Sequence, residues 1–199
     1  GKPLWYADEL DADDNPTGKR VTTSDYASAD YYYVNKSSLP KVYGGFNTSL
    51  SWKGFDLSAI FAYSIGGYIY NRDITMILHN GSLEGRAWST EILRRWTPDN
   101  RYTDVPALST TSNNWNSAST RFLQNNSYMR LKNLTLSYNL PKPWVSKLAL
   151  SSVQVYVQGD NLFTIHKNQG LDPEQGITGI TYYRYPAMRT ISGGINIAF

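Results

Sequence analysis

Five stretches of the chain alternate apolar and polar side chains with a period of two, which is typical of β-strands that have two different faces. The predicted strands lie at about residues 42–52, 55–64, 121–140, 152–159 and 188–199. In the last of these, isoleucines share one side with glycine, while serine and asparagine occupy the other. The pattern therefore predicts antiparallel strands with one apolar face and one face rich in small polar and amide side chains.

The connectors between these strands alternate in length. Lys53 and Gly54 alone join the first two strands, and about ten residues join the third and fourth. The other two connectors, residues 65–120 and 161–187, are long. Outer-membrane barrels have short periplasmic turns and long extracellular loops. The chain is therefore predicted to place both long loops outside the cell, with the last strand running inward.

The alternation also predicts which side chains share a face. We expect the following residues to face lipid: Val42, Phe46, Leu50, Leu134, Leu136, Val153, Val155, Ile195 and Ile197. We expect the following to face the barrel lumen: Asn47, Ser49, Asn133, Ser137, Gln154 and Asn196. Aromatic residues near the short connectors, such as Trp52 and Trp144, suit the periplasmic aromatic girdle of a barrel.

A soluble β-sandwich is the alternative architecture, and its functional counterpart is a lectin-like carbohydrate-binding module that uses loop aromatics. The amide-rich face favours a wet barrel lumen over the apolar interior of a sandwich. Five strands cannot close a barrel and would expose two edges, so the chain is expected to be part of something larger. The N-terminus also lacks a signal-peptide pattern, which favours a missing N-terminal part over a cytoplasmic chain.

Outside the strands, regular structure is sparse. Residues 1–38 show no sustained period and are predicted to be an irregular extracellular loop region that precedes the strands. One helix is predicted at 84–96, with Pro98 as its stop signal. Three of its apolar residues recur every four positions, namely Trp88, Ile92 and Trp96. Packing of this helix is favoured over sugar stacking for its two tryptophans.

Composition excludes several classes of protein. The 16 tyrosines and an aromatic content of 14% suit strands and wet–apolar boundaries, and no apolar run is long enough for a membrane helix. The net charge of +3 is scattered, which argues against nucleic-acid binding. Cysteine is absent, so a thiolate zinc site is impossible.

Catalytic chemistry is not predicted. The two histidines, His79 and His166, have no ligand-type spacing, and the sequence has no nucleophile elbow, phosphate-binding loop or dinucleotide fingerprint. Asp172 and Glu174 flank Pro173, where a structural turn role is favoured over a hydrolase pair. We therefore expect neither an enzyme nor a bound cofactor or metal.

Several segments resemble the C-terminal signatures of SusC/RagA-family TonB-dependent transporters of Bacteroidetes. They are LPKVYGGFNTSLSWKGFDLSAIFAYSIGG (39–67), SYMRLKNLTLSYNLP (127–141), VYVQGDNLF (155–163), GLDPE (170–174) and YPAMRTISGGINIAF (185–199). Five such matches in family order span residues 39–199 and form a specific signal. The resemblance implies five C-terminal strands of an outer-membrane β-barrel of about 22 strands. It also implies a plug and a TonB contact in an absent N-terminal part, and a SusD-like surface lipoprotein as partner. Glycans are the cargo that the resemblance favours, with peptides as the alternative.

Many relatives carry a calcium-loop-like segment ahead of these strands. The acidic residues at 8–15 lack both the spacing and the distal glutamate of an EF-hand loop, so a solvated acidic loop is favoured over a calcium site. Tyr102 and Trp115 in the long loop are candidates for cargo binding by stacking, with loop packing as the alternative. Phe199, an aromatic residue that ends an alternating strand, is predicted to be an assembly signal for barrel insertion; a dispensable girdle residue is the alternative.

Overall fold

The computed structural model describes residues 1–81, 83–109, 114–174 and 176–199, and it consists of two compact units. The sheet unit comprises residues 36–69, 124–179 and 183–199. The loop unit comprises residues 1–35, 70–123 and 180–182. Each unit is described by itself.

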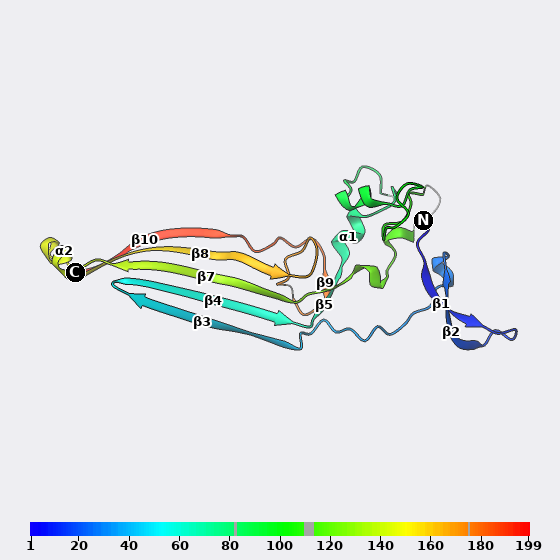
Figure 1. Ribbon diagram of the computed structural model, residues 1–199, viewed down its shortest axis with the longest axis horizontal. Helices are drawn as coiled ribbons and strands as arrows, with labels where there is room; N and C mark the ends of the chain where they lie inside the picture. Colours follow the sequence, from blue (N-terminus) through cyan, green and yellow to red (C-terminus); the bar gives the residue numbers. More distant parts are fainter. Residues whose placement is uncertain (82, 110–113, 175) are drawn as a thin grey trace. The chain divides into compact units, whose positions relative to one another are not determined.

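The sheet unit is built on a five-stranded antiparallel sheet with the strand order β10-β8-β7-β4-β3 (Figure 1). Its strands are β3 (Val42–Trp52), β4 (Phe55–Ile65), β7 (Tyr128–Asn139), β8 (Ser152–His166) and β10 (Thr190–Ala198). Strands that are neighbours in the sheet follow one another along the chain, so the sheet is a meander. This confirms the five predicted strands and their antiparallel arrangement. The residues that the structure describes do not form a closed barrel.

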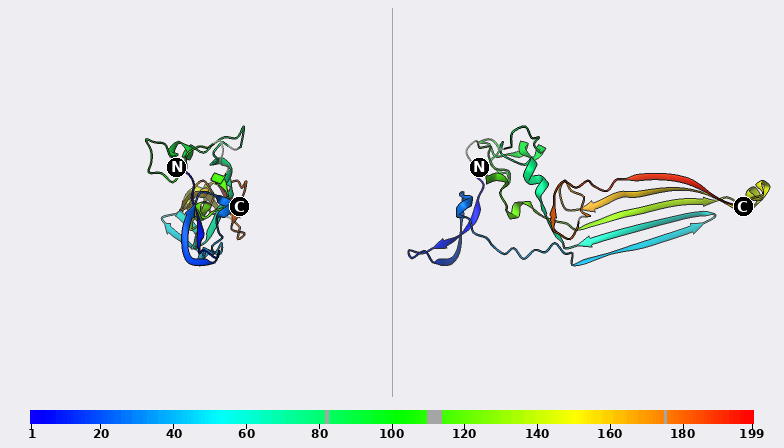
Figure 2. Two further views of the ribbon diagram at one scale, coloured as in Figure 1. Left: turned by 90° about the vertical axis from the view of Figure 1, so that its right-hand side faces the viewer. Right: turned by 180° about the vertical axis from the view of Figure 1, so that it is seen from behind.

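Both short connectors lie at the same end of the sheet, as the alternating connector lengths predict (Figure 2). Lys53 and Gly54 join β3 to β4 with φ angles of 49° and 89°, the left-handed conformation that two-residue hairpin turns require. The connection from β7 to β8 contains α2 (Lys142–Val145) and η5 (Ser146–Leu148). η5 ends at Ala149, whose φ of 56° reverses the chain before β8.

The largest difference from a predicted strand end is found in β8, and the sheet is irregular where β8 pairs with β7. The pairing of β7 with β8 shifts register between Leu131 and Asn133, and Asn161 in the facing part of β8 has a φ of 52°. Such a bulge breaks the period-two count. For this reason the alternation predicted an end at residue 159, whereas β8 continues to His166.

The loop unit contains a β-hairpin where the sequence predicted irregular structure. Strands β1 (Trp5–Leu10) and β2 (Pro16–Thr23) pair in an antiparallel register that matches Trp5 with Thr23. The prediction was wrong because β2 is solvent-exposed at almost every position, so neither of its faces requires apolar residues. Asp11 stabilises the connecting turn by accepting hydrogen bonds from the backbone N–H groups of Asp13 (2.9 Å) and Asn15 (3.0 Å).

The prediction of an α-helix at 84–96 was also wrong. Only the 3₁₀ helix η2 (Thr90–Arg94) forms there, capped by Ser89, and Trp96 donates its backbone N–H to the Val105 carbonyl instead of continuing a helix. The α-helix of the first long connector is instead α1 (Arg72–Ile77), whose N-terminus is capped by the side chain of Asn71.

The remaining elements are short. They are η1 (Tyr26–Ser28), β5 (Tyr68–Asn71), η3 (Asn114–Asn116), η4 (Thr120–Phe122), β6 (Leu123–Asn125) and β9 (Ile180–Thr181). β5 and β9 pair in parallel through Tyr70 with Ile180 and Asn71 with Thr181. Across the described part of the chain, none of the helices combines the length and the apolar character that a membrane-spanning helix needs.

Candidate functional site

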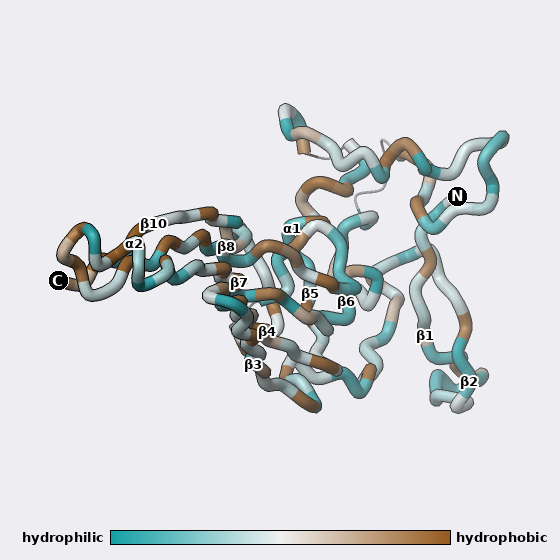
Figure 3. The backbone as a smooth tube through the Cα atoms, turned by 60° about the vertical axis from the view of Figure 1, so that its left-hand side comes forward, coloured by the Kyte–Doolittle hydropathy of each residue, from teal (hydrophilic) through white to brown (hydrophobic). Residues whose placement is uncertain are grey.

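The five-stranded sheet has one apolar and one polar face, and cross-strand pairing places every predicted residue on the expected side. Leu57, for example, pairs with Leu50 on β3 and with Leu136 on β7, and Leu136 pairs in turn with Val157 on β8. Because paired residues point to the same side of a sheet, these side chains form one apolar row. Figure 3 shows the resulting alternation of hydrophobic and hydrophilic positions along the strands.

The apolar face is exposed rather than packed into a core. The exposed fractions of Leu50, Ile195 and Ile191 are 66%, 61% and 71%. Phe46 and Phe61 stack on this face with their ring centroids 4.7 Å apart. A soluble protein rarely leaves an apolar surface of this extent uncovered, so the face requires an apolar environment.

The polar face carries a hydrogen-bonded ladder that crosses all five strands near the short connectors. Asp56 on β4 accepts hydrogen bonds from Ser51 Oγ on β3 (2.5 Å) and from Asn139 Nδ2 on β7 (2.7 Å). Gln154 on β8 donates to Asn139 Oδ1 (3.1 Å) and accepts from Asn196 Nδ2 on β10 (3.1 Å). Each strand thus contributes one side chain, and the polar groups satisfy one another on a surface that stays hydrophilic.

A second polar row lies nearer the middle of the sheet. Asp160 on β8 accepts hydrogen bonds from Asn133 Nδ2 (2.8 Å) and Gln158 Nε2 (3.2 Å). Thr135 donates its hydroxyl proton to Asn133 Oδ1 at 2.9 Å. This row explains why asparagine, threonine and glutamine alternate with leucine and valine along β7 and β8.

A buried arginine anchors one long connector to the polar face. Arg130 on β7 is 3% exposed, and its Nε donates to Thr164 Oγ1 at 2.8 Å. Its two terminal nitrogens reach Glu174 Oε2 (2.8 Å) and Asp172 Oδ1 (2.5 Å) in the connector from β8 to β10. Lys132 adds an ion pair with Glu174 at 2.8 Å. Because all five N–H groups of arginine lie in one plane, a single side chain can bind the strand and the loop together.

Asp172 is the centre of this anchor. Its carboxylate also accepts hydrogen bonds from the backbone N–H groups of Glu174 (2.9 Å) and Ala187 (2.7 Å). Burial alone would raise the pKa of Asp172, but these two hydrogen bonds and the Arg130 guanidinium outweigh burial, and the pKa is lowered. The structure thus gives Asp172 and Glu174 the structural turn role that the sequence favoured.

A cavity of about 320 Å³ lies at the end of the sheet from which the long connectors leave. Aromatic rings and small polar side chains make up much of its wall, including Tyr43, Tyr63, Tyr68, Tyr128, Ser38 and Asn126. Lys36 Nζ lies 4.6 Å from the centre of the Tyr68 ring. Such a mixture of rings, hydroxyl groups and amides can contact both sugars and peptide groups.

The predicted cargo-stacking residues differ in exposure. Tyr102 is fully exposed at 100%, whereas Trp115 is only 2% exposed and packs with Leu78, Ile92 and Val105 in the core of the loop unit. In this structure the position of Trp115 fits loop packing, and stacking on a cargo would require the cluster to open. Its role in cargo binding stays a prediction, as does that of Tyr102.

His79 is buried beside this cluster with an unusual set of partners. Its Nδ1 accepts hydrogen bonds from Trp88 Nε1 (3.1 Å) and from the backbone N–H of Gly81 (3.2 Å), and its side chain is 1% exposed. An Nδ1 atom that accepts two hydrogen bonds cannot carry a proton, so the ring is neutral with its proton on Nε2. Burial and, secondarily, the charge of Arg86 lower the pKa of His79.

This arrangement predicts that the loop unit loosens in acid. The contribution of a neutral buried histidine is complete above its ordinary pKa of 6.5 and is lost as pH falls below that value toward the lowered pKa. Hydrogen exchange at the Gly81 amide, corrected for the intrinsic rate, should therefore accelerate between about pH 7 and about pH 5. His79→Asn keeps an acceptor but does not titrate, so its exchange should be insensitive to pH. The same pH dependence in this variant, or its loss in the control His166→Asn, would contradict the assignment.

Sequence reasoning missed the ladder and the arginine anchor. Asp56 and Asn139 are far apart in sequence, and only the strand register brings them within 2.7 Å. A signal for the anchor was nonetheless present, because Arg130 and Lys132 are two cations on a strand whose other residues are neutral, and the later GLDPE segment supplies two carboxylates.

Comparisons with known proteins give a consistent result. No protein-family model matches the chain. The chain is 34% identical over 96% of its length to the TonB-dependent receptor P3 of Formosa agariphila, and 27% identical over 84% of its length to the TonB-dependent receptor SusC of Bacteroides thetaiotaomicron. It spans about a fifth or less of the length of these curated relatives.

A solved structure shows the same fold. The chain superposes over its full length on 21% of a chain in the structure of the RagAB peptide importer in the closed-closed state, with a TM-score of 0.82 and 36% sequence identity. The likeness therefore covers both the sheet unit and the loop unit.

Proposed function

Because the chain is a portion of a SusC/RagA-family TonB-dependent receptor, a member of a family of outer-membrane transporters rather than enzymes, we propose that its sheet supplies five adjacent strands of a transmembrane barrel of about 22 strands. The observation that carries this proposal is the pairing of an exposed apolar face with a hydrogen-bonded polar face. Lipid would cover the first face, and water or a plug would lie against the second.

We further propose the orientation of the strands. The short connectors at 53–54 and 140–151 would lie in the periplasm, and the long connectors would lie outside the cell. This is supported by the meander topology, which collects the short connectors at one end of the sheet. The Arg130 anchor would then hold the second long connector against the lumen side of the outer rim.

The proposed cargo is an oligomeric nutrient, and the proposed partner is a SusD-like surface lipoprotein. The structural neighbour is a peptide importer and forms a complex, RagAB, which supports peptides as one cargo class. Glycans, which the family resemblance favoured, remain the other proposed class. The tyrosine-lined cavity and the exposed ring of Tyr102 are compatible with both, because rings stack on sugar faces and hydroxyl groups bind peptide groups.

Uptake by cells tests this proposal. A strain that lacks the full-length gene should lose uptake of labelled oligopeptides or of labelled oligosaccharides, and re-expression of the gene should restore the lost activity. Loss of one class and retention of the other would identify the cargo. Unchanged uptake of both classes, with the protein absent from the outer-membrane fraction of the parent strain, would contradict the proposed function.

Phe199 remains our proposed assembly residue. Its ring follows β10 and is 91% exposed, so it contributes little to packing of the sheet unit. Deletion of Phe199 from the full-length protein should sharply lower the amount in the outer membrane, while the molecules that insert transport normally. Immunoblotting of membrane fractions measures the amount of inserted protein, and uptake divided by that amount measures transport per molecule. Normal abundance with lost uptake would instead place Phe199 in the transport mechanism.

A further inference from the structure

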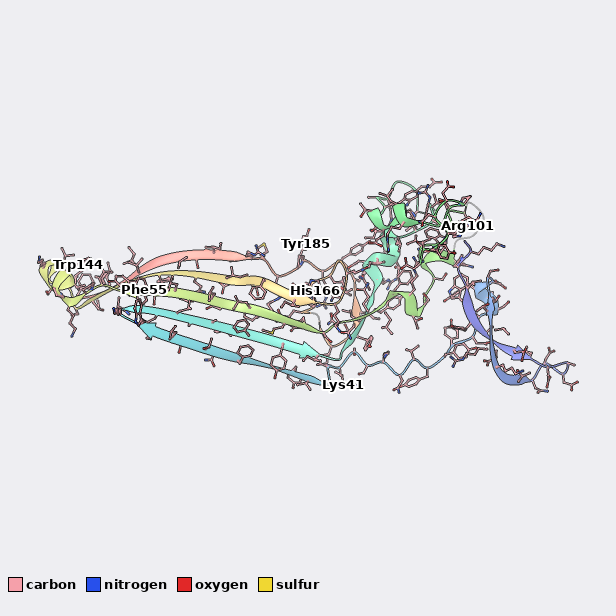
Figure 4. All side chains as sticks on the ribbon, viewed as in Figure 1. Lys41, Phe55, Arg101, Trp144, His166 and Tyr185 are labelled. Carbon is pink, nitrogen blue, oxygen red and sulfur yellow. The ribbon has the colours of Figure 1, made fainter. Side chains whose placement is uncertain are left out.

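The two short connectors carry exposed aromatic and aliphatic side chains at one end of the sheet. We call this surface the short-connector rim and define it by Trp52, Lys53, Lys142, Trp144, Lys147 and Leu148. Trp52, Trp144 and Leu148 are 64%, 62% and 69% exposed. Figure 4 shows Trp144 at this end of the sheet, beyond Phe55, with Lys41 and His166 at the opposite end. Large apolar side chains with this exposure need a partner that covers them.

The helical turn between β7 and β8 holds these side chains outward. Val145 is 2% exposed, and its carbonyl accepts the backbone N–H of Leu150 at 3.4 Å, so this residue closes the turn on its inner side. Trp144 and Leu148 lie four residues apart across α2 and η5, and both side chains are exposed. Lys147 belongs to the same turn, three residues after Trp144.

The charges of the rim are all positive. Lys53, Lys142 and Lys147 belong to the two short connectors, and residues 53–54 and 140–151 contain no aspartate or glutamate. Lys53 Nζ lies 4.9 Å from the ring centre of Trp52. Asp56, the acidic residue that follows the first connector, is engaged by Ser51 and Asn139 on the polar face. The rim is thus a set of cations interleaved with apolar side chains.

We propose that the short-connector rim binds phospholipids with anionic headgroups. Trp and Leu side chains would enter the acyl boundary as a continuation of the apolar sheet face, and the lysines would extend their ammonium groups to the phosphates. Charge complementarity and continuity with the apolar face favour lipid over a protein partner, because one helical turn and one tight turn offer far less area than a stable protein interface. The inference rests on the proposed barrel function.

Native mass spectrometry of the full-length transporter tests this surface. The protein is reconstituted into vesicles of equimolar phosphatidylglycerol and phosphatidylcholine, extracted gently, and its retained lipids are counted. The wild-type protein should retain phosphatidylglycerol in excess, and the excess should shrink at high salt. Lys142→Gln and Lys147→Gln should each lower the excess about fivefold. Lys142→Arg combined with Lys147→Arg should preserve it.

Lys167→Gln is the matched control, because Lys167 follows β8 at the opposite end of the same sheet. An equal effect of this control, or an excess that persists at high salt in the wild-type protein, would overturn the inference. The measurement at high salt uses only the wild-type protein, so it can still overturn the inference where a glutamine variant fails to insert. Failure of the wild-type protein to enter vesicles would instead refute the proposed barrel, whereas insertion without headgroup preference would refute the rim alone.

Discussion

Arg130→Gln should release the connector between β8 and β10 from the sheet. The substitution removes the guanidinium that binds Asp172 at 2.5 Å and Glu174 at 2.8 Å, and thereby breaks the ion pair of an Asp172 side chain that is only 7% exposed. Removal of one partner from a buried ion pair costs about 3–5 kcal/mol. Hydrogen exchange at the Ala187 amide, which donates to Asp172, should accelerate accordingly in the full-length protein.

Lys132→Gln is the matched control for this prediction. Lys132 also binds Glu174, at 2.8 Å, but both side chains are more than a third exposed, so its loss should cost about 0–1 kcal/mol. Equal effects of the two substitutions would show that charge alone, and not the buried fork of Arg130, holds the loop. Arg130→Lys should fall between them, since an ammonium group cannot bind Thr164 and both carboxylates in one plane.

The same anchor has a defined response to acid. The pKa of Asp172 is lowered in the folded state, so its contribution is present above the ordinary value of 3.8 and is lost as pH falls through the lowered value. The anchor should therefore be insensitive to pH across the neutral and mildly acidic range, where the stabilising contribution of the neutral His79 to the loop unit begins to be lost. Exchange at the Gly81 and Ala187 amides should separate the two events in one experiment.

The strands and their faces could be predicted because the period-two pattern is a local property of the sequence. Val153 and Gln154 reveal opposite faces without knowledge of their partners, and the register then pairs Val153 with Ile197 and Gln154 with Asn196. Connector lengths added the topology. The bulge near Asn133 could not be predicted, because an extra residue in one strand is visible only against the partner strand.

The loop unit shows where the same reasoning fails. In the segment predicted as a helix, Ile92 is buried in the apolar cluster, but Trp88 turns to His79 and Trp96 pairs with Val105 through the backbone. The three apolar side chains spaced four residues apart therefore have three different tertiary roles, and they do not lie on one face of an α-helix. Tertiary contacts override weak periodicity where a segment has few regular hydrogen bonds.

Arginine at the centre of the apolar face should destabilise the full-length protein far more than arginine beside it on the polar face. Phe46 and Asn47 are neighbours near the middle of β3, and their partners on β4 are Phe61 and Ile60. Phe46→Arg would place a cation in the lipid at mid-depth, at a cost of about 2–4 kcal/mol. It would also remove the stacking of Phe46 on Phe61.

Asn47→Arg differs by one position and therefore points to the other face, where a cation would meet water and polar groups. We expect a change within about 0.5 kcal/mol, the range of ordinary surface substitutions. Denaturant unfolding of the two variants in lipid vesicles measures the difference, and Phe46→Leu controls for the lost aromatic stacking. Comparable penalties at both positions would mean that both faces are buried in protein, as in a sandwich, and would remove the main support for the barrel.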